Sequence, residues 1–463
     1  MENSIFRQTE ECAASEKPGP GPMKTILRYL LNNRLSAAAV LAAVSLLMVF
    51  ACAAPDRGGY PPVETLPETE IDLPGSGDVP VVRVLILETE DRIRIDISGG
   101  QVAAKSEDGR TIGRFEVSGT LALSKTRNGL RLKQRNRPVH EAPIMEIRPT
   151  GDSGFTIGET PYRGGLLLRR HGGKKIQAIN VIEIDDYLKG VLPAEIGYLK
   201  EGQYEAYKVQ AIASRSYALS KLEEKKNEPF DMRATIMDQV YKGIKGENRV
   251  ASEAVEKTRG VVGVWDGEPI RAYYSACCGG HTSDVRVGWP WKAHYPYLYG
   301  RRDALGEAGK SFCSSSRHFR WEVVWSGSDL SRITGRTLPA ELGGRVPPFN
   351  VIRDIKVVGY APSGRAIAVD IVTDKGTHRV EGDRIRWVLR PDSSKGPILR
   401  STLFKMEVSR SGGRVKQIRV KGGGNGHGVG MCQSGAIGMA TEGFSAERIL
   451  AHYYPGVSLV RIY

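Results

Sequence analysis

The strongest constraint on the fold is a run of helical periodicity from Tyr204 to Glu224. Small and apolar residues recur there at the three- and four-residue spacing of an α-helix: Val209, Ile212, Ala213, Ser216 and Leu219. The residues between them include polar ones: Lys208, Gln210, Arg215 and Lys221. The pattern predicts an amphipathic helix that ends before Asn227 and Pro229.

A single carboxylate just before this helix is the main catalytic candidate. Glu195 lies in the segment Gly190–Gly197, and its neighbours are apolar: Val191, Leu192, Pro193, Ala194 and Ile196. Apolar surroundings raise the pKa of a carboxyl group, so that it keeps its proton near neutral pH, as a general acid must. The alternative is a glutamate at a turn whose carboxylate is in solvent.

Short alternating segments separated by glycine-rich turns surround this region and predict strands. The predicted strands are 82–87, 93–97, 113–117, 130–132, 162–168, 176–184, 261–265, 270–274, 321–325, 355–358, 367–372, 404–408 and 415–420. Short helices are predicted at 251–258 and 328–334, and Asp185 and Asp186 stand where a helix N-cap is expected. The sequence therefore predicts an α+β fold, rich in short strands around a central helix-bearing catalytic core.

The N-terminal part predicts export. Basic residues (Lys24, Arg28 and Arg34) precede an uncharged stretch at 35–51, so residues 1–51 are interpreted as a leader with a signal peptide. The stretch around Cys52 loosely matches a bacterial lipoprotein signal, which predicts lipidation of Cys52 and a membrane tether. Ordinary cleavage and an uncleaved anchor are the alternatives.

The rest of the chain divides by composition. Residues 52–80 are rich in Pro, Gly, Asp and Glu and predict a flexible linker. Residues 81–180 form a β-rich N-terminal part, and residues 181–463 form the core, with a β-rich insertion at about 320–405.

The net charge of +14 predicts an anionic partner. Nucleic acid is excluded as the expected partner because an exported chain rarely meets it and because the basic residues are scattered among strands. Bacterial cell wall and anionic lipid are the partners that fit an exported, basic protein.

A dense glycine run at 422–435 contains His427 and Gln433. It lacks the Gly-Lys-Ser/Thr ending of a phosphate-binding loop. Six glycines within residues 422–430 favour a loop that faces a ligand, followed by a helix near Gln433, and a tight turn is the alternative. A further loop with polar side chains is expected at 238–243.

Four cysteines fall in the predicted core: Cys277, Cys278, Cys313 and Cys432. In an oxidising compartment a disulfide from Cys277 or Cys278 to Cys313 is the expected arrangement. A four-ligand zinc site drawn from Cys277 or Cys278, His281, Cys313 and His318 is the alternative. A nucleophile pair of Cys432 and His427 lacks an orienting acid.

Several of these motifs, in order along the chain, resemble the SpoIID/LytB domain family. They are Gly190–Glu195, the helix at 206–218, Asp238–Gly243, Tyr274–Thr282, Gly426–Gln433 and Ile449–Gly456. The resemblance extends from about Val82 to Tyr463, and several ordered motifs over that length are far more specific than any single one.

The resemblance implies a peptidoglycan lytic transglycosylase in which Glu195 is the catalytic acid and base, or an amidase enhancer that binds the cell wall. The substrate is then the bond between N-acetylmuramic acid and N-acetylglucosamine in peptide-free glycan, cleaved to a 1,6-anhydro product. Expected substrate-binding residues are Arg215, Tyr241, Ser275, His427 and Gln433. No cofactor is required, and a structural zinc at Cys277, Cys278 and His281 is implied by some family members.

Overall fold

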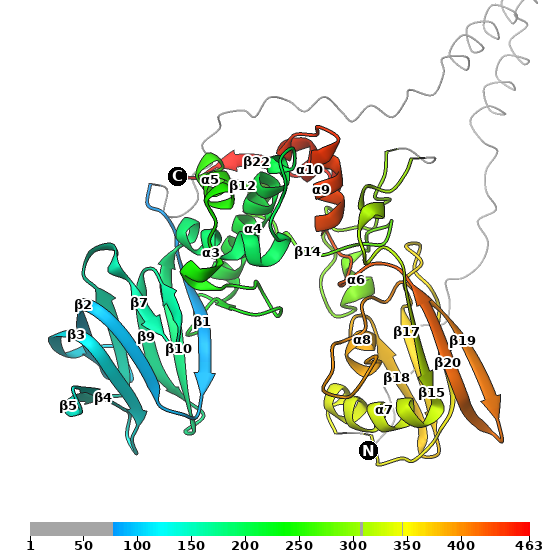
Figure 1. The fold of residues 1–463 in the computed structure, drawn as a ribbon, viewed down its shortest axis with the longest axis horizontal. Coiled ribbons are helices and arrows are strands. Elements are labelled where there is room, and N and C mark those ends of the chain that lie inside the picture. Colours follow the sequence, from blue (N-terminus) through cyan, green and yellow to red (C-terminus); the bar gives the residue numbers. More distant parts are fainter. Residues whose placement is uncertain (1–76, 306–308, 345) are drawn as a thin grey trace, which may run out of the picture. The chain divides into compact units, whose positions relative to one another are not determined.

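The computed structural model describes residues 77–305, 309–344 and 346–463, which form a mixed α+β fold rich in strands, as predicted (Figure 1). The leader, the lipidation predicted at Cys52 and most of the linker lie outside the described residues. Within the described part of the chain, no helix is both long and apolar enough to cross a membrane.

The N-terminal part is one large, mainly antiparallel sheet. Its strands are β1 (Val81–Thr89), β2 (Ile93–Lys105), β3 (Thr111–Lys125), β4 (Leu130–Gln134), β5 (Arg137–Ala142), β6 (Ile144–Pro149), β7 (Phe155–Ile157), β8 (Thr160–Tyr162), β9 (Gly165–His171), β10 (Lys175–Glu183) and β11 (Met232–Arg233), with the 3-10 turn η1 (Gly151–Ser153) after β6. The order is β11-β1-β10-β9-β6-β2-β3-β4-β5, and β7 pairs with β2 and β8. Alternate side chains of the long strands form an apolar core, as the period-2 pattern requires.

The central core consists mainly of helices. They are α3 (Ile184–Ile196), α4 (Tyr204–Glu224), α5 (Arg249–Lys257), α6 (Val285–Gly288), α9 (Gln433–Thr441) and α10 (Ala446–Tyr453), with short 3-10 turns η2 (Gly243–Gly246) and η3 (Phe312–Ser315). The helix predicted at 204–224 has the predicted limits. It is not amphipathic in the predicted sense, because Gln210, Arg215 and Lys221 are buried together with its apolar residues.

The chain enters this core through α3, which continues directly from β10. The helix starts one residue before Asp185, so Asp185 and Asp186 lie in its first turn and Glu183 is the N-cap. The helix also runs through Pro193 to Ile196. Glu195 therefore lies in the last turn of the helix. The alternative, a glutamate at a turn with its carboxylate in solvent, predicted the wrong backbone conformation for this segment.

Two small sheets complete the core. The first has the order β13-β12-β22, from Glu268–Pro269, Val261–Trp265 and Ser458–Arg461. In the second, β14 (Tyr274–Ser275) pairs in parallel with β21 (Met431–Cys432). The strand predicted at 270–274 is wrong for residues 270–273, which belong to none of the strands described.

An inserted lobe has its own apolar core. Its sheets are β15-β20-β19 (Trp321–Ser326, Arg414–Gly422, Phe404–Ser411) and β16-β17-β18 (Ile352–Val357, Ala368–Thr373, Gly376–Glu381), and its helices are α7 (Gly327–Leu342) and α8 (Arg384–Val388). The lobe extends beyond the predicted end near residue 405, because β20 pairs with β15 along Trp321–Ser326.

Candidate functional site

Glu195 is a half-buried carboxyl group in the last turn of α3. Its Oε1 atom accepts one hydrogen bond from the backbone N–H of Val240, at 2.5 Å. Burial raises the pKa of Glu195 from its usual value to about 7, and the Val240 bond acts in the opposite direction. Among the described residues, no cation contributes to this shift. The group is therefore close to half protonated at neutral pH, as the sequence predicted for a general acid.

The loop that supplies the Val240 N–H packs directly against α3 at Gly190. A Cβ atom at residue 190 would lie 2.7 Å from both the Gly243 carbonyl oxygen and the Tyr241 ring. The Lys242 N–H also donates to the Gly190 carbonyl. Glycine at this position lets the 238–243 loop approach closely enough for Val240 to reach the carboxyl group one helical turn further on.

Gln239 fixes the loop from the other side. Its side-chain oxygen accepts a hydrogen bond from the Tyr187 hydroxyl at 3.0 Å, and its amide donates to the Tyr274 hydroxyl at 3.0 Å and to the Ser214 carbonyl at 3.3 Å. Burial raises the pKa values of both tyrosines, and the nearby charge of Glu195 raises them further. A fully buried amide thus orders the polar groups around the acid.

The network continues away from Glu195 through helix α4. The Gln433 amide donates to Gln210 Oε1 at 3.2 Å, and the Gln210 amide donates to Ser214 Oγ at 3.0 Å. Gln433 is almost completely buried, and its amide is hydrogen-bonded within the protein. Gln433 stabilises the hydrogen-bond network around Glu195 from within the core. The predicted contact between Gln433 and substrate does not fit this buried position.

Arg215 lies inside the protein, which contradicts the prediction that it faces a substrate groove. Its side chain is 0% exposed and donates two hydrogen bonds to Asp185 Oδ1, at 2.7 and 2.9 Å. It also donates to the carbonyls of Val255 and Val261. These partners use its hydrogen-bonding capacity within the core, so the arginine holds α3, α4 and α5 together.

Tyr241 and Ser275 also serve packing. The Tyr241 hydroxyl donates to Asn180 Oδ1 at 3.0 Å, and its ring lies 4.9 Å from that of Tyr187. Ser275 Oγ accepts the Gly428 N–H at 3.2 Å. Both residues are buried, so the predicted substrate contacts do not fit their positions.

The glycine run packs against protein atoms. A Cβ atom at Gly428 would lie 2.1 Å from the Arg365 guanidinium, and one at Gly430 would lie 2.0 Å from the Tyr273 carbonyl oxygen. Both glycines also have positive φ angles, which glycine adopts readily. The glycines are therefore needed for close packing, and the expected ligand-facing backbone is not required to explain them. The helix predicted near Gln433 is confirmed by α9.

His427 lies in an aromatic cluster. Its ring centre is 4.8 Å from that of Trp289 and 6.4 Å from that of Tyr273, and the Lys292 ammonium lies over both of these aromatic rings. Burial lowers the pKa of His427 to about 4. A neutral histidine among aromatic side chains can contact an uncharged part of a ligand, but it is no cation near neutral pH.

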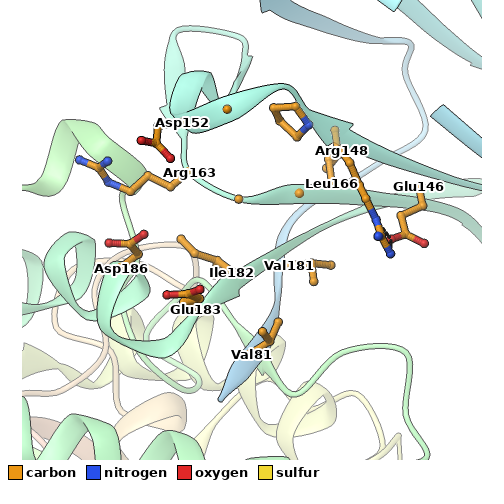
Figure 2. Close-up of a pocket in the computed structure, with 14 residues that line it drawn as sticks. Val81, Glu146, Arg148, Asp152, Arg163, Leu166, Val181, Ile182, Glu183 and Asp186 are labelled. Carbon is orange, nitrogen blue, oxygen red and sulfur yellow. Dashed lines mark hydrogen bonds and ion pairs between the residues drawn. The ribbon is translucent and has the colours of Figure 1, made fainter. Parts of the chain in front are cut away.

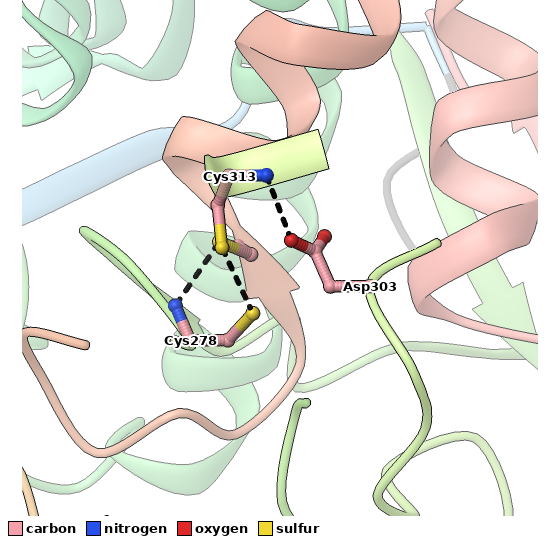
Figure 3. A group of neighbouring side chains, drawn as sticks. Cys278, Asp303 and Cys313 are labelled. Atoms are coloured by element: carbon pink, nitrogen blue, oxygen red, sulfur yellow. Dashed lines mark hydrogen bonds between the residues drawn. The ribbon is translucent and has the colours of Figure 1, made fainter. Parts of the chain in front are cut away.

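The four cysteines of the core are free and buried. The Cys278 and Cys313 sulfurs are 3.7 Å apart, whereas a disulfide requires about 2.05 Å, so the predicted bond is absent. Cys278, Cys313 and Cys432 lie together with Asp303 (Figure 3). His281 is not in this group, and its Nδ1 atom donates to the Thr282 carbonyl at 2.7 Å.

A surface pocket lies at the opposite end of α3 from Glu195. Its lining includes Arg163, Glu183 and Asp186 near the start of α3, together with residues of β6, β9 and β10 (Figure 2). Arg163 is ion-paired with Glu247. Glu195 is not among its lining residues, so this pocket is not the binding site next to the catalytic candidate.

The residues that sequence reasoning missed are those of the hydrogen-bond network: Tyr187, Gln210, Ser214, Gln239 and Tyr274. Gln210 and Ser214 are four residues apart and therefore share a helix face, which was an available signal. The sequence did not show that this face points into the core, because it does not reveal that α4 is buried on nearly all sides.

Known proteins resemble parts of this chain. The stage II sporulation protein family matches residues 172–265, and a domain of unknown function matches residues 302–430. An uncharacterized protein of Brachyspira hyodysenteriae is 28% identical over 82% of this chain and 93% of its own length. Stage II sporulation protein D of Bacillus amyloliquefaciens is 27% identical over 70% of this chain and 86% of its own length. The amidase enhancer of Bacillus subtilis is 27% identical over 59% of this chain, a match that covers 40% of the enhancer.

Proposed function

Because the chain belongs to the SpoIID/LytB family, we propose that it is a peptidoglycan lytic transglycosylase with Glu195 as its general acid and base. The observation that carries the proposal is the position of Glu195: a half-buried carboxyl group with a pKa raised to about 7 and a single backbone donor. The site lies within the part of the chain that matches the stage II sporulation protein family.

One carboxyl group is enough for this reaction. Protonated Glu195 gives its proton to the glycosidic oxygen as the bond from muramic acid C1 breaks. The 6-hydroxyl of the same sugar then forms a bond to C1, and its proton returns to the Glu195 carboxylate. The products are a 1,6-anhydro end and a free hydroxyl on the leaving sugar, with no water consumed.

Hydrolysis would normally use a second carboxylate. The loop that contacts Glu195 contains one carboxylate, Asp238, and both of its oxygens accept hydrogen bonds from the protein. Asp238 Oδ1 accepts the Tyr217 hydroxyl at 2.9 Å, and Oδ2 accepts the Arg233 N–H at 3.0 Å. This arrangement supports a mechanism in which Glu195 acts alone.

An exposed aromatic residue offers a platform for a sugar ring. Tyr198 follows Glu195 by three residues and is 77% exposed. Two large apolar residues, Ile236 and Met237, are also exposed on the loop that leads to Val240. We assign glycan binding to this surface in place of the predicted buried residues. The chain's net positive charge suits peptide-free glycan, whose muramic acids expose carboxylates.

The proposed activity is tested with purified protein and peptide-free glycan strands. We expect products whose mass shows the anhydro end, which is one water lighter than the hydrolysed end. Products that carry the additional water would contradict the lytic assignment, as would complete inactivity on both peptide-free and peptide-bearing strands.

A wall-binding amidase enhancer is the second candidate, favoured by the similarity to the Bacillus subtilis protein of that name. Replacing Glu195 by Gln separates the two functions because it keeps the shape of the side chain and removes its proton. An enzyme should lose about 100- to 10,000-fold in glycan cleavage. An enhancer should keep its stimulation of an amidase, and equal stimulation without any cleavage would favour the second candidate. Either function places the protein outside the cytoplasm, where the predicted leader and tether would hold it near the wall.

A further inference from the structure

A tight turn at 289–292 holds a lysine against aromatic rings. The turn is closed by the Lys292 N–H, which donates to the Trp289 carbonyl at 3.0 Å. Pro290 occupies the second of its four positions, where proline is favoured. Because the first and fourth residues of such a turn lie close together, the side chains of Trp289 and Lys292 reach the same neighbour, Tyr273.

The Lys292 ammonium is held by aromatic faces and one hydroxyl group. Its nitrogen lies 4.7 Å from the centre of the Tyr273 ring and 5.1 Å from that of the Trp289 ring. It also donates to the Tyr273 hydroxyl at 2.5 Å. These contacts favour a cation but supply no full negative charge. Among the described residues, no carboxylate pairs with Lys292.

The acids whose charges act on Lys292 already have other partners. They are Glu224 and Asp238. Glu224 pairs with Lys221 at 3.2 Å and also with Arg271, and both oxygens of Asp238 accept hydrogen bonds. Lys292 is half-buried, and this burial lowers its pKa. A half-buried ammonium without a counter-ion of its own gains stability when an anion binds beside it.

The turn is connected to the loop that contacts Glu195. The Tyr273 ring packs edge-on against the Tyr217 ring, with their centres 5.8 Å apart. The Tyr217 hydroxyl donates at 2.9 Å to Asp238, in the loop whose backbone donates to Glu195. Tyr273 and Tyr217 therefore link the ammonium of Lys292 to the loop that holds the catalytic candidate.

The inserted lobe fixes the turn from another side. The Asp383 N–H donates to the Gly288 carbonyl, directly before the turn, at 2.7 Å. The Arg384 guanidinium lies 4.7 Å from the centre of the Trp291 ring, yet Trp291 remains 59% exposed. The position of Lys292 is thus set before any ligand binds, which lowers the entropic cost of binding.

A sugar that carries one carboxylate fits these groups. Each muramic acid has a lactyl group whose carboxylate is free once the stem peptide has been removed. While the peptide is attached, the same carbon belongs to a neutral amide. The Lys292 ammonium can pair with the free carboxylate, and the exposed ring of Trp291 offers an apolar surface for a sugar ring.

We propose that Lys292 binds the lactyl carboxylate of a muramic acid and thereby selects peptide-free strands. The inference rests on the proposed function for its ligand, and it assigns the selection to one side chain in place of the net charge of the chain. A strand that still carries its peptides would cover the ammonium without neutralising it. Such a strand should therefore bind less tightly.

Binding to defined oligosaccharides tests the proposal without turnover. Protein with Glu195→Gln is titrated calorimetrically with peptide-free oligosaccharides of alternating N-acetylglucosamine and N-acetylmuramic acid. The second probe is the same oligosaccharide with each lactyl carboxylate converted to a methylamide. We expect the carboxylate form to bind about 10-fold or more tightly. Equal affinities for the two probes would overturn the proposal, and this comparison requires no variant of Lys292.

Variants assign the preference to Lys292. Lys292→Met should weaken binding of the carboxylate probe about 10- to 100-fold and leave binding of the methylamide probe within about 3-fold, whereas Lys292→Arg should keep most of the preference. Lys226→Met is the matched control, because it removes an equal charge from an exposed lysine that pairs with Glu223. It should leave both affinities unchanged. Equal losses in Lys226→Met and Lys292→Met would show that only net charge matters and would contradict the assignment.

The outcomes also separate this inference from the proposed reaction. Carboxylate-dependent binding through Lys292 in a protein that cleaves no glycan would leave the inference standing and reject the reaction. Cleavage with equal affinity for the two probes would do the reverse. Vesicles of phosphatidylglycerol test the competing ligand, an anionic lipid. If Lys292→Met abolishes binding to the vesicles and leaves oligosaccharide binding unchanged, the ammonium binds lipid and the proposal is wrong.

Discussion

Helix α3 carries two acids with opposite surroundings. At its first turn, Asp185 is paired with the buried guanidinium of Arg215 and also accepts the Tyr463 hydroxyl at 3.0 Å. At its last turn, Glu195 has one backbone donor and no ion-pair partner in the described part of the chain. The C-terminal end of a helix is also its negative end, which disfavours a carboxylate there.

The two environments suit different roles: Asp185 stabilises the structure, and Glu195 can transfer a proton. Asp185 is compensated by a cation, so its charge holds three helices in place. Glu195 lacks such compensation, and its raised pKa leaves a proton available for transfer near neutral pH. The same side-chain chemistry thus serves packing at one end of the helix and, in our proposal, catalysis at the other.

Breaking the structural pair should have the largest effect on stability. Arg215→Met leaves Asp185 buried without its cation and should lower the free energy of unfolding by about 3–5 kcal/mol. Urea unfolding measures this loss. The matched control is Arg131→Met, which removes an exposed pair with Glu141 and should cost less than about 1 kcal/mol. Equal losses in the two variants would show that the buried pair has no special role.

Displacing the loop that contacts Glu195 should reduce activity more than stability. Gly190→Ala forces the Tyr241 and Gly243 region away from α3, so Val240 would no longer be held against the acid. We expect glycan cleavage to fall about 10- to 100-fold. Gly335→Ala in α7, where a Cβ atom meets open space, is the control and should leave cleavage unchanged. Full activity in Gly190→Ala would mean that the Val240 contact is dispensable.

The uncompensated acid should also make stability depend on pH. Folding raises the pKa of Glu195, so its contribution is fully present below about pH 4.5 and is lost as the pH rises through about 7. Glu195→Gln should therefore match the wild-type protein near pH 4.5 and exceed its stability by about 3 kcal/mol above pH 8. Thermal or urea unfolding at several pH values measures this difference, and a pH-independent one would contradict it.

The same contrast shows what the sequence could predict. The apolar neighbours of Glu195 correctly indicated a raised pKa, and the periodicity of α4 located that helix. The role of Arg215 could not be predicted, because its partner Asp185 is 30 residues away and their contact depends on how α3 packs against α4. Glycine density similarly indicated a special loop without showing whether protein or ligand lay against it.

The cysteines illustrate the same limit. Their number and the predicted export suggested a disulfide, and only the tertiary structure shows that Cys432 joins a segment 154 residues earlier in the chain. The inserted lobe likewise exceeded its predicted end because strand pairing, which is non-local, sets its boundary. Local patterns predicted elements well, and contacts between distant segments determined the site.

Titration of the Glu195 carboxyl group tests the central claim most directly, because it does not depend on substrate or assay. Difference infrared spectra between wild-type protein and Glu195→Gln, recorded across pH, isolate the protonated form of this one side chain. The account predicts an apparent pKa of about 7. A pKa near 4.5, the usual value for glutamate, would mean that Glu195 is ionised at neutral pH and would contradict its role as the proton donor.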